Sequence, residues 1–361
     1  MNRQFFPGYS IGTDAYDDIK TICKTYGKTA AIIGGKRALD ASQEKILAAM
    51  QDSGVEPTGV FWYGGEASVE NITLLEENPA VAKADMIFAV GGGKAIDTGK
   101  VLAHRTGLPF FTFPTIASTC ASCTSLGILY HSDGSLREYS FSKETPVHIF
   151  IDSGVIARAP REYLWAGIGD TMAKFYECTV SGRGDTLSHS EALGTVISTM
   201  CADPLVAYGV QALQDCDHNT VSKALEEVIL GIIVSTGFVS NLVSIDYNTG
   251  LAHAVYNGFT ILPQIEKYGH LHGEIVFYGI LILLLVDEQI QEFERVYRFG
   301  LQMGFPTCLR ALHTEIGEMP AVAEKALQGI DVRHYPYKVH KEMLLSAVRQ
   351  LEKYFSEHKN P

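Results

Sequence analysis

Three residues in the second half of the sequence have side chains that commonly bind metal ions: Asp170, His253 and His272. One carboxylate and two imidazoles leave a fourth position open for a substrate or a water molecule, which is what a catalytic zinc-type site requires. Taken singly, an aspartate at a helix start is usually a cap, and a histidine usually belongs to the core or the surface. The residue types therefore favour a metal site, but their spacing alone leaves these alternatives open.

A second candidate site is the glycine run Gly91, Gly92 and Gly93, which Lys94 and Asp97 follow. Glycines let the backbone approach a ligand closely, and the free N–H groups and dipole of a helix start favour a phosphate group. The run is not the G-x-G-x-x-G fingerprint, and a lone glycine triplet is as often a tight turn. Its place at the carboxyl end of a predicted strand, where open α/β sheets bind ligands, favours a dinucleotide pyrophosphate.

The elements that would position these residues change character near the middle of the chain. Short β-like runs alternate with helical patterns at first, which is typical of an α/β domain with a largely parallel sheet. Predicted strands cover residues 29–33, 60–63, 86–90, 109–113 and 147–151, and a predicted hairpin covers 125–139. Beyond Pro160, apolar residues recur at helical spacing. We expect an α/β domain over residues 1–157 and an all-helical domain over residues 158–361.

Composition and charge exclude several classes of function. The 361 residues are 46% hydrophobic and 19% charged, typical of a folded protein with two domains. The net charge of −12 gives no attraction to nucleic acid or to an anionic membrane. The most apolar stretch, 276–286, is short of the roughly 18 residues that span a bilayer and predicts a buried helix. The N-terminus lacks a signal-peptide pattern, so we expect a cytoplasmic protein.

The seven cysteines are scattered, and an odd number without an export signal predicts free thiols. Cys120 and Cys123 form a C-x-x-C motif, which is compatible with redox chemistry or with half of a zinc site. No second pair follows at zinc-finger spacing, so both interpretations are disfavoured.

Five motifs occur in the same order as in a known family. They are Gly91 to Lys100, Pro114 to Thr119, Gly167 to Ala173, His253 to Thr260 and His272 to Glu274. Together they closely resemble the glycerol dehydrogenase branch of the metal-dependent, iron-containing type of alcohol dehydrogenase, from about residue 7 into the helical half. The resemblance implies a dinucleotide-binding domain, a helical metal domain, and hydride transfer between a substrate and a nicotinamide. It implies NAD(P)(H) and a divalent metal as cofactors.

The resemblance also implies roles for individual residues. Asp170, His253 and His272 match the metal ligands and form the catalytic centre. The candidate cofactor contacts are Gly35, Lys36, Gly91, Gly92, Gly93, Lys94, Asp97, Thr115, Ser118, Thr124, Leu126 and Tyr130. Iron-using members have a further histidine four residues after the aspartate, where this chain has Lys174. The ligand set is therefore similar to that of the three-ligand, zinc-using glycerol dehydrogenases.

Two positions depart from the family's pattern. Cys120 stands where the family usually has an aspartate that contacts the polyol, so an anionic acceptor is lost and a substrate carboxylate no longer meets like-charge repulsion. We therefore expect 2-oxo or 2-hydroxy acids, or other small carbonyl compounds, to be accepted at least as well as glycerol. After the first predicted strand, Gly35, Lys36 and Arg37 stand where NAD-preferring relatives have an acid that binds the adenosine ribose. This predicts that NADPH is used, although both cations are also typical of a solvated helix start.

The main expectation is a metal-dependent, NAD(P)-linked oxidoreductase that interconverts a small alcohol or polyol and its carbonyl compound. One alternative is an NADPH-preferring 2-oxo acid reductase, that is, a hydroxycarboxylate dehydrogenase. Others are a lyase similar to 3-dehydroquinate synthase, and a nucleotide- or metal-binding protein without catalysis. The expected partners are a small-molecule substrate and further copies of the chain in a homo-oligomer, with neither nucleic acid nor a membrane.

Overall fold

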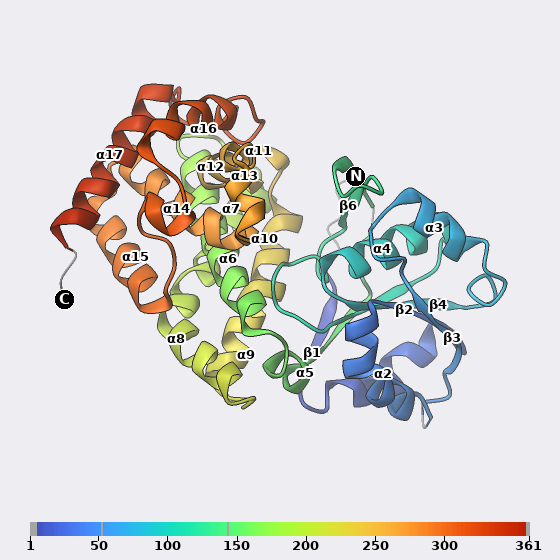
Figure 1. Cartoon of the computed structure of the whole chain (residues 1–361). Helices are drawn as coiled ribbons and strands as arrows, with labels where there is room; N and C mark the ends of the chain where they lie inside the picture. The colour runs from blue at the N-terminus through green and yellow to red at the C-terminus, as the bar shows by residue number, and fades with distance from the viewer. Residues whose placement is uncertain (1–5, 52, 143, 359–361) are drawn as a thin grey trace. The chain divides into compact units, whose positions relative to one another are not determined.

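A computed structural model describes residues 6–51, 53–142 and 144–358 (Figure 1). The chain divides into two compact units. Unit 1 comprises Met1–Leu164 and Ala212–Asn241, and unit 2 comprises Trp165–Gln211 and Leu242–Pro361. The predicted boundary between residues 157 and 158 is near the first crossing between the units, but residues 212–241, predicted to belong to the helical domain, return to unit 1.

Unit 1 is built on a six-stranded sheet in the order β1-β8-β5-β4-β2-β3, with every neighbouring pair parallel. The strands are β1 (Gly8–Gly12), β2 (Thr29–Gly34), β3 (Glu56–Trp62), β4 (Met86–Gly91), β5 (Phe110–Pro114) and β8 (His148–Asp152). β6 (Leu126–Tyr130) and β7 (Leu136–Phe141) form a separate antiparallel pair. The α/β fold with a mostly parallel sheet is confirmed, and so is the hairpin.

The sheet has a hydrophobic core on each face because successive side chains of a strand point in opposite directions. Ile32 and Phe88 belong to one core, which also contains side chains of α2, and Ile33 and Ile87 belong to the other. All residues of β4, β5 and β8 are buried, as expected for inner strands of a parallel sheet. The helices between the strands include α1 (Ile19–Ile22), α2 (Lys36–Gln51), α3 (Val69–Glu76) and α4 (Gly93–Thr106), and α5 (Ser153–Ala157) follows the last strand.

Residues 212–241 return to unit 1 through specific contacts. They include α9 (Lys223–Leu230), a π-helical turn (Gly231–Ser235) and most of α10 (Thr236–Leu242). The Ser153 hydroxyl donates to Glu226 at 2.9 Å, and the Asn241 amide donates to the Cys123 carbonyl at 3.2 Å. At Gly237 a Cβ atom would lie 2.4 Å from the Cys123 sulfur, so α10 lies directly against the loop that follows β5.

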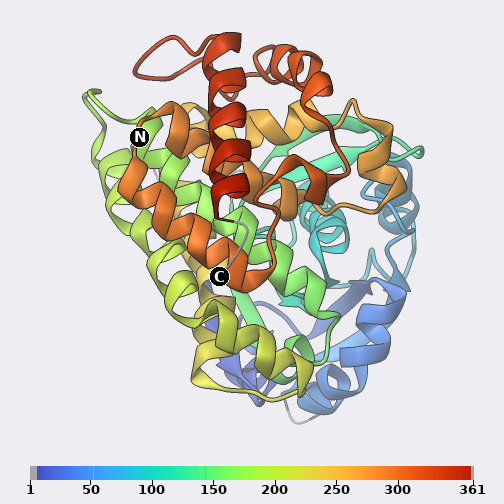
Figure 2. The same cartoon turned by 60° about the vertical axis from the view of Figure 1, so that its left-hand side comes forward.

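Unit 2 is helical, and Figure 2 brings its helices forward. They are α6 (Arg161–Ser181, from Trp165), α7 (His189–Ile197), α8 (Asp203–Asp217, to Gln211), α11 (Ile245–Asn248), α12 (Leu251–Phe259), α13 (Pro263–Lys267), α14 (His272–Val286), α15 (Ile290–Met303), α16 (Met319–Ala326) and α17 (Lys341–Glu357). Every residue of α14 from Ile275 to Val286 is buried, which confirms the predicted buried helix.

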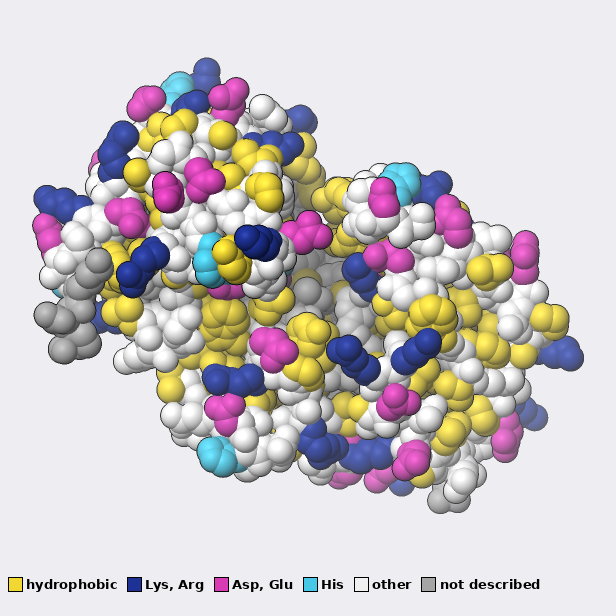
Figure 3. Space-filling view, in the orientation of Figure 1, with side chains coloured by type: hydrophobic (Ala, Val, Ile, Leu, Met, Phe, Trp, Pro, Cys, Tyr) yellow, Lys and Arg dark blue, Asp and Glu magenta, His cyan; other side chains and the backbone are white. Residues whose placement is uncertain are grey.

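Two helical stretches, His189–Asp217 and Lys223–Leu242, are long and apolar enough to cross a membrane by length and composition alone. A 3₁₀ turn at Ser198–Cys201 divides the first, and the π turn divides the second. Core helices of soluble proteins pass the same test, so these stretches are weak evidence for a membrane protein. On the face drawn in Figure 3, acidic and basic side chains are interspersed.

Candidate active site

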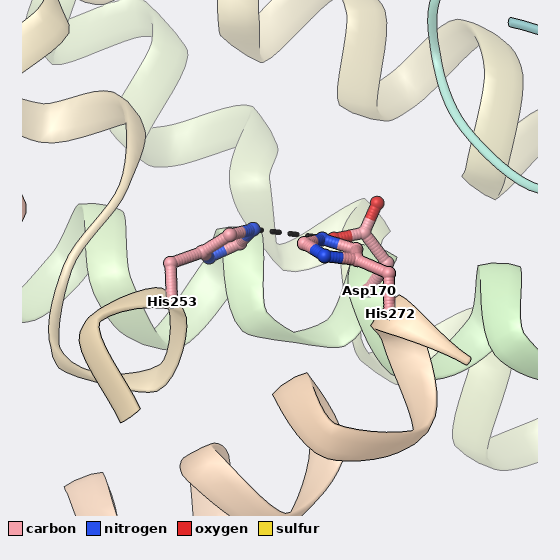
Figure 4. A group of neighbouring side chains, drawn as sticks. All are labelled: Asp170, His253 and His272. Carbon is pink, nitrogen blue, oxygen red and sulfur yellow. Dashed lines mark hydrogen bonds and ion pairs between the residues drawn. The ribbon is translucent and has the colours of Figure 1, made fainter. Parts of the chain in front are cut away.

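The three predicted metal ligands meet in unit 2 (Figure 4). Asp170 lies on α6, His253 on the first turn of α12, and His272 is the first residue of α14. One ligand atom from each residue lies within 4.8 Å of the other two, and this is the one such group of three found in the part of the chain that the structure describes. The Nε2 atoms of His272 and His253 lie 3.1 and 3.2 Å from Oδ1 of Asp170. His272 is 42% exposed, so the cluster is open to a small molecule.

Two glycines next to the ligands bring α6 and α14 together. A Cβ atom on Gly169 would lie 2.3 Å from the carbonyl oxygen of Gly273. A Cβ atom on Gly273 would lie 1.8 Å from the carbonyl oxygen of Ala166. Any side chain at either position would force the two helices apart. Because Gly169 precedes Asp170 and Gly273 follows His272, the close contact of the helices is what brings these two ligands together.

A third glycine brings α14 close to α12. A Cβ atom on Gly279 would lie 2.4 Å from the carbonyl oxygen of Ala252, the residue before His253. The buried helix α14 is therefore the common support against which both other helices place their ligands.

The electrostatics of the cluster favour a cation. Burial alone would raise the pKa of Asp170, but the His272 and His253 imidazoles outweigh it and hold that pKa well below its usual range. Burial would lower the pKa of His253, but the carboxylates of Glu177 and Asp170 raise it to about 10. Two carboxylates beside two imidazoles, with oxygen and nitrogen donors converging, match the chemistry of a divalent metal site.

Lys174 lies one helical turn after Asp170. Its ammonium group donates to the carbonyl and side-chain oxygens of Asn248. An ammonium group has no lone pair to give to a metal. The donor set among the described residues is therefore that of Asp170, His253 and His272.

Several of the candidate cofactor residues lie at the carboxyl edge of the sheet in unit 1. Strands β2, β4 and β5 are neighbours, and Gly35 and Thr115 follow β2 and β5. The Gly35 N–H donates to the Val90 carbonyl, and the Thr115 N–H donates to the Gly91 carbonyl, both at 3.3 Å. This edge is where open α/β sheets bind ligands.

The glycines at the start of α4 let other groups come close to its main chain. Gly91 has a φ of +141°, which side chains rarely adopt, and a Cβ atom on Gly92 would lie 2.7 Å from the Ile116 side chain. At Gly93 the nearest atom to an added Cβ would be 3.6 Å away, so there is open space beside this first residue of α4. Lys94 lies 2.6 Å from a carboxylate oxygen of Glu66 and 5.0 Å from the Tyr130 ring centre.

Several other candidate cofactor residues hold the hairpin to α4. The buried Lys100 ammonium lies 2.9 Å from Asp97 and donates to the Leu126 carbonyl at 2.5 Å. Its distance to the Thr124 hydroxyl is 3.5 Å. The other Asp97 oxygen accepts the Ile128 N–H, so the Asp97 carboxylate is engaged within the protein.

The family of the chain follows from comparisons with known proteins. Residues 7–153 match the model of the iron-containing alcohol dehydrogenases. Hydroxycarboxylate dehydrogenase A of Escherichia coli (strain K12) is 34% identical over 90% of each chain. The chain belongs to the iron-containing alcohol dehydrogenase family. Within that family, glycerol dehydrogenase of Thermotoga maritima is 32% identical over 82% of each chain. The crystal structure of glycerol dehydrogenase from Schizosaccharomyces pombe superposes with a TM-score of 0.85 at 26% identity, covering 99% of this chain and 92% of that chain.

The two positions that depart from this family's pattern both lie in unit 1. The Cys120 sulfur is 4.0 Å from the Ser240 hydroxyl, which α10 supplies. The Lys36 ammonium lies over the Trp62 ring, 4.4 Å from its centre. Ser118 lies half-buried in the same loop as Cys120.

Four residues at these sites are absent from the sequence-based candidates: Glu177, Glu66, Lys100 and Ser240. Glu177 is seven residues after Asp170 on α6, so helical spacing alone could have placed both on one face. The other three reach their sites through tertiary contacts, for which the sequence holds no local signal.

Proposed function

We propose that this member of the family interconverts small 2-hydroxy acids and 2-oxo acids, with Asp170, His253 and His272 as ligands of a zinc ion and NADP(H) as the hydride carrier. The broader activity, metal-dependent oxidoreduction of an alcohol or polyol, is that of the family. The observation that carries the substrate assignment is Cys120, an uncharged residue beside the Ser240 hydroxyl.

The metal assignment rests on the converging donors and on Lys174. Three ligands from nitrogen and oxygen donors are typical of catalytic zinc sites, whereas a further histidine at position 174 would make the set of the iron-using members. When bound, a divalent cation supplies a Lewis acid for an alcohol or a carbonyl group. The three side chains would hold and orient that cation, and the exposed side of His272 would leave room for the substrate.

The cofactor assignment rests on the start of α4. The N–H group of Gly93, the first residue of α4, and the ammonium group of Lys94 would hold the pyrophosphate, as helix N-termini do for phosphates. Lys94 would exchange its carboxylate partner Glu66 for a phosphate oxygen. When bound, the nicotinamide cofactor would supply the hydride donor or acceptor.

The substrate assignment rests on charge. An aspartate at position 120 would repel a substrate carboxylate, and a thiol does not. The relative named hydroxycarboxylate dehydrogenase A supports the acid, while the relatives named glycerol dehydrogenase keep glycerol as a second candidate. A homo-oligomer and a cytoplasmic location stay predictions from the sequence.

Steady-state kinetics with a small panel test the proposal. Dihydroxyacetone, 2-oxobutyrate and 2-oxoglutarate are each reduced with NADH and with NADPH, with zinc present. We expect the highest kcat/KM for an oxo acid with NADPH. A clear preference for dihydroxyacetone would establish an ordinary glycerol dehydrogenase in which Cys120 is a tolerated substitution.

Cofactor preference is tested separately at Gly35. A Cβ atom there would lie no closer than 3.6 Å to its nearest neighbour, so the backbone has room for a side chain at this position. We expect Gly35→Asp to shift the kcat/KM ratio toward NADH by about tenfold, because its carboxylate repels a 2′-phosphate and accepts from the ribose hydroxyls. The uncharged Gly35→Asn is the control, and unchanged selectivity in the aspartate variant would contradict a role for this position.

A further inference from the structure

Glu177 is a buried carboxylate with two hydrogen bonds to a single residue. Its side chain is 0% exposed, and it lies on the same helix as Asp170. Oε1 accepts the main-chain N–H of His253 at 2.8 Å, and Oε2 lies 2.7 Å from Nδ1 of the same histidine. We propose that Glu177 is a positioning residue that fixes the tautomer of His253 and thereby sets the metal affinity. This inference rests on the proposed ligand set.

The argument begins with what a carboxylate can do. An ionised carboxylate only accepts hydrogen bonds, so Nδ1 of His253 carries the proton that it donates to Glu177. A metal binds the neutral form of an imidazole, which has one ring proton. With that proton on Nδ1, Nε2 is the atom with the free lone pair. Nε2 is also the atom that lies 3.2 Å from Asp170 and faces the cluster. Glu177 therefore selects the tautomer that can bind a metal.

Glutamine at position 177 would reverse this selection. An amide offers one acceptor and one donor group where the carboxylate offers two acceptors. The main-chain N–H of His253 always donates, so the amide oxygen faces it and the NH₂ group faces Nδ1. Nδ1 must then accept, and the ring proton moves to Nε2. The ring keeps its place but loses the lone pair that faces Asp170.

Zinc affinity is the readout, because it does not depend on the substrate. The full-length chain and its variants compete for Zn²⁺ with a fluorescent chelator. We expect Glu177→Gln to weaken zinc binding by about 10- to 100-fold, the range typical of lost partners of metal-bound histidines. Glu177→Asp keeps two acceptor oxygens and is expected to fall between wild type and Glu177→Gln.

Glu292→Gln is the matched control. Glu292 accepts the Tyr176 hydroxyl at 2.6 Å and pairs with Arg295, so it is a carboxylate of unit 2 that contacts none of the proposed ligands. We expect this variant to keep wild-type zinc affinity even if its thermal stability falls. Loss of affinity in both glutamine variants would show a general effect of removing carboxylates and would overturn the role of Glu177.

The remaining outcomes separate the inference from the ligand assignment. Wild-type zinc affinity in Glu177→Gln overturns the inference, whereas wild-type affinity in Asp170→Asn overturns the ligand set itself. If the Glu177→Gln variant does not fold, a second measurement on the wild type still tests the proposal. Nitrogen NMR of the zinc-loaded wild type is expected to show the His253 proton on Nδ1 and zinc on Nε2, and the opposite arrangement would overturn the proposal.

Discussion

Replacing Gly273 by alanine is expected to destroy the metal site and to destabilise the protein. The added methyl group would lie 1.8 Å from a main-chain oxygen of α6, an atom that cannot move without moving the helix. Overpacking typically costs about 1 to 3 kcal/mol of the free energy of unfolding, and a contact with main-chain atoms this close places the variant at the upper end of that range. Separation of α6 and α14 also moves Asp170 away from His272, so we expect zinc binding to be lost and kcat/KM to fall by at least about 100-fold.

Gly317→Ala is the matched control in the same unit. Nothing lies within 4 Å of a Cβ atom built on Gly317, and its φ is not in the left-handed region. Denaturant unfolding and zinc content are measured for both variants. We expect the control to keep wild-type stability and zinc. If Gly273→Ala also kept both, the close approach of the two helices would not be what positions the ligands.

The inner strands could be predicted from the sequence because burial on both faces leaves a continuous apolar run. β4 and β8 are entirely buried and were predicted for this reason. β1 (Gly8–Gly12) was missed because it lies at the sheet edge, where its residues are exposed or half-buried. The assignment of residues 212–241 to unit 1 could not be predicted either, because helical periodicity identifies a helix but not the unit against which it packs.

The candidate site shows the same limits at single residues. Asp170, His253 and His272 were named from residue type and family resemblance, and the structure brings them together. Glu177 was missed because a buried carboxylate and a solvated one look alike in a helical pattern. Burial and its two hydrogen bonds to His253 are tertiary facts that local spacing does not contain.

The substrate preference is expected to change when Cys120 becomes aspartate. A carboxylate at this position would accept hydrogen bonds from the hydroxyl groups of a polyol and repel the carboxylate of an oxo acid. Each effect contributes about 1 to 2 kcal/mol in a partly buried site. We therefore expect the ratio of kcat/KM for dihydroxyacetone to that for 2-oxobutyrate to rise by about 100-fold.

Cys120→Asn separates charge from shape, because asparagine has the size of aspartate without its charge. Steady-state kinetics of both variants are compared with the wild type at saturating cofactor. The asparagine variant is expected to keep the wild-type ratio, since it removes the thiol without adding repulsion. If both variants shifted the ratio equally, side-chain volume next to Ser240 would control specificity rather than charge. If charge controls specificity, only the Cys120→Asp variant raises the ratio of kcat/KM for dihydroxyacetone to that for 2-oxobutyrate.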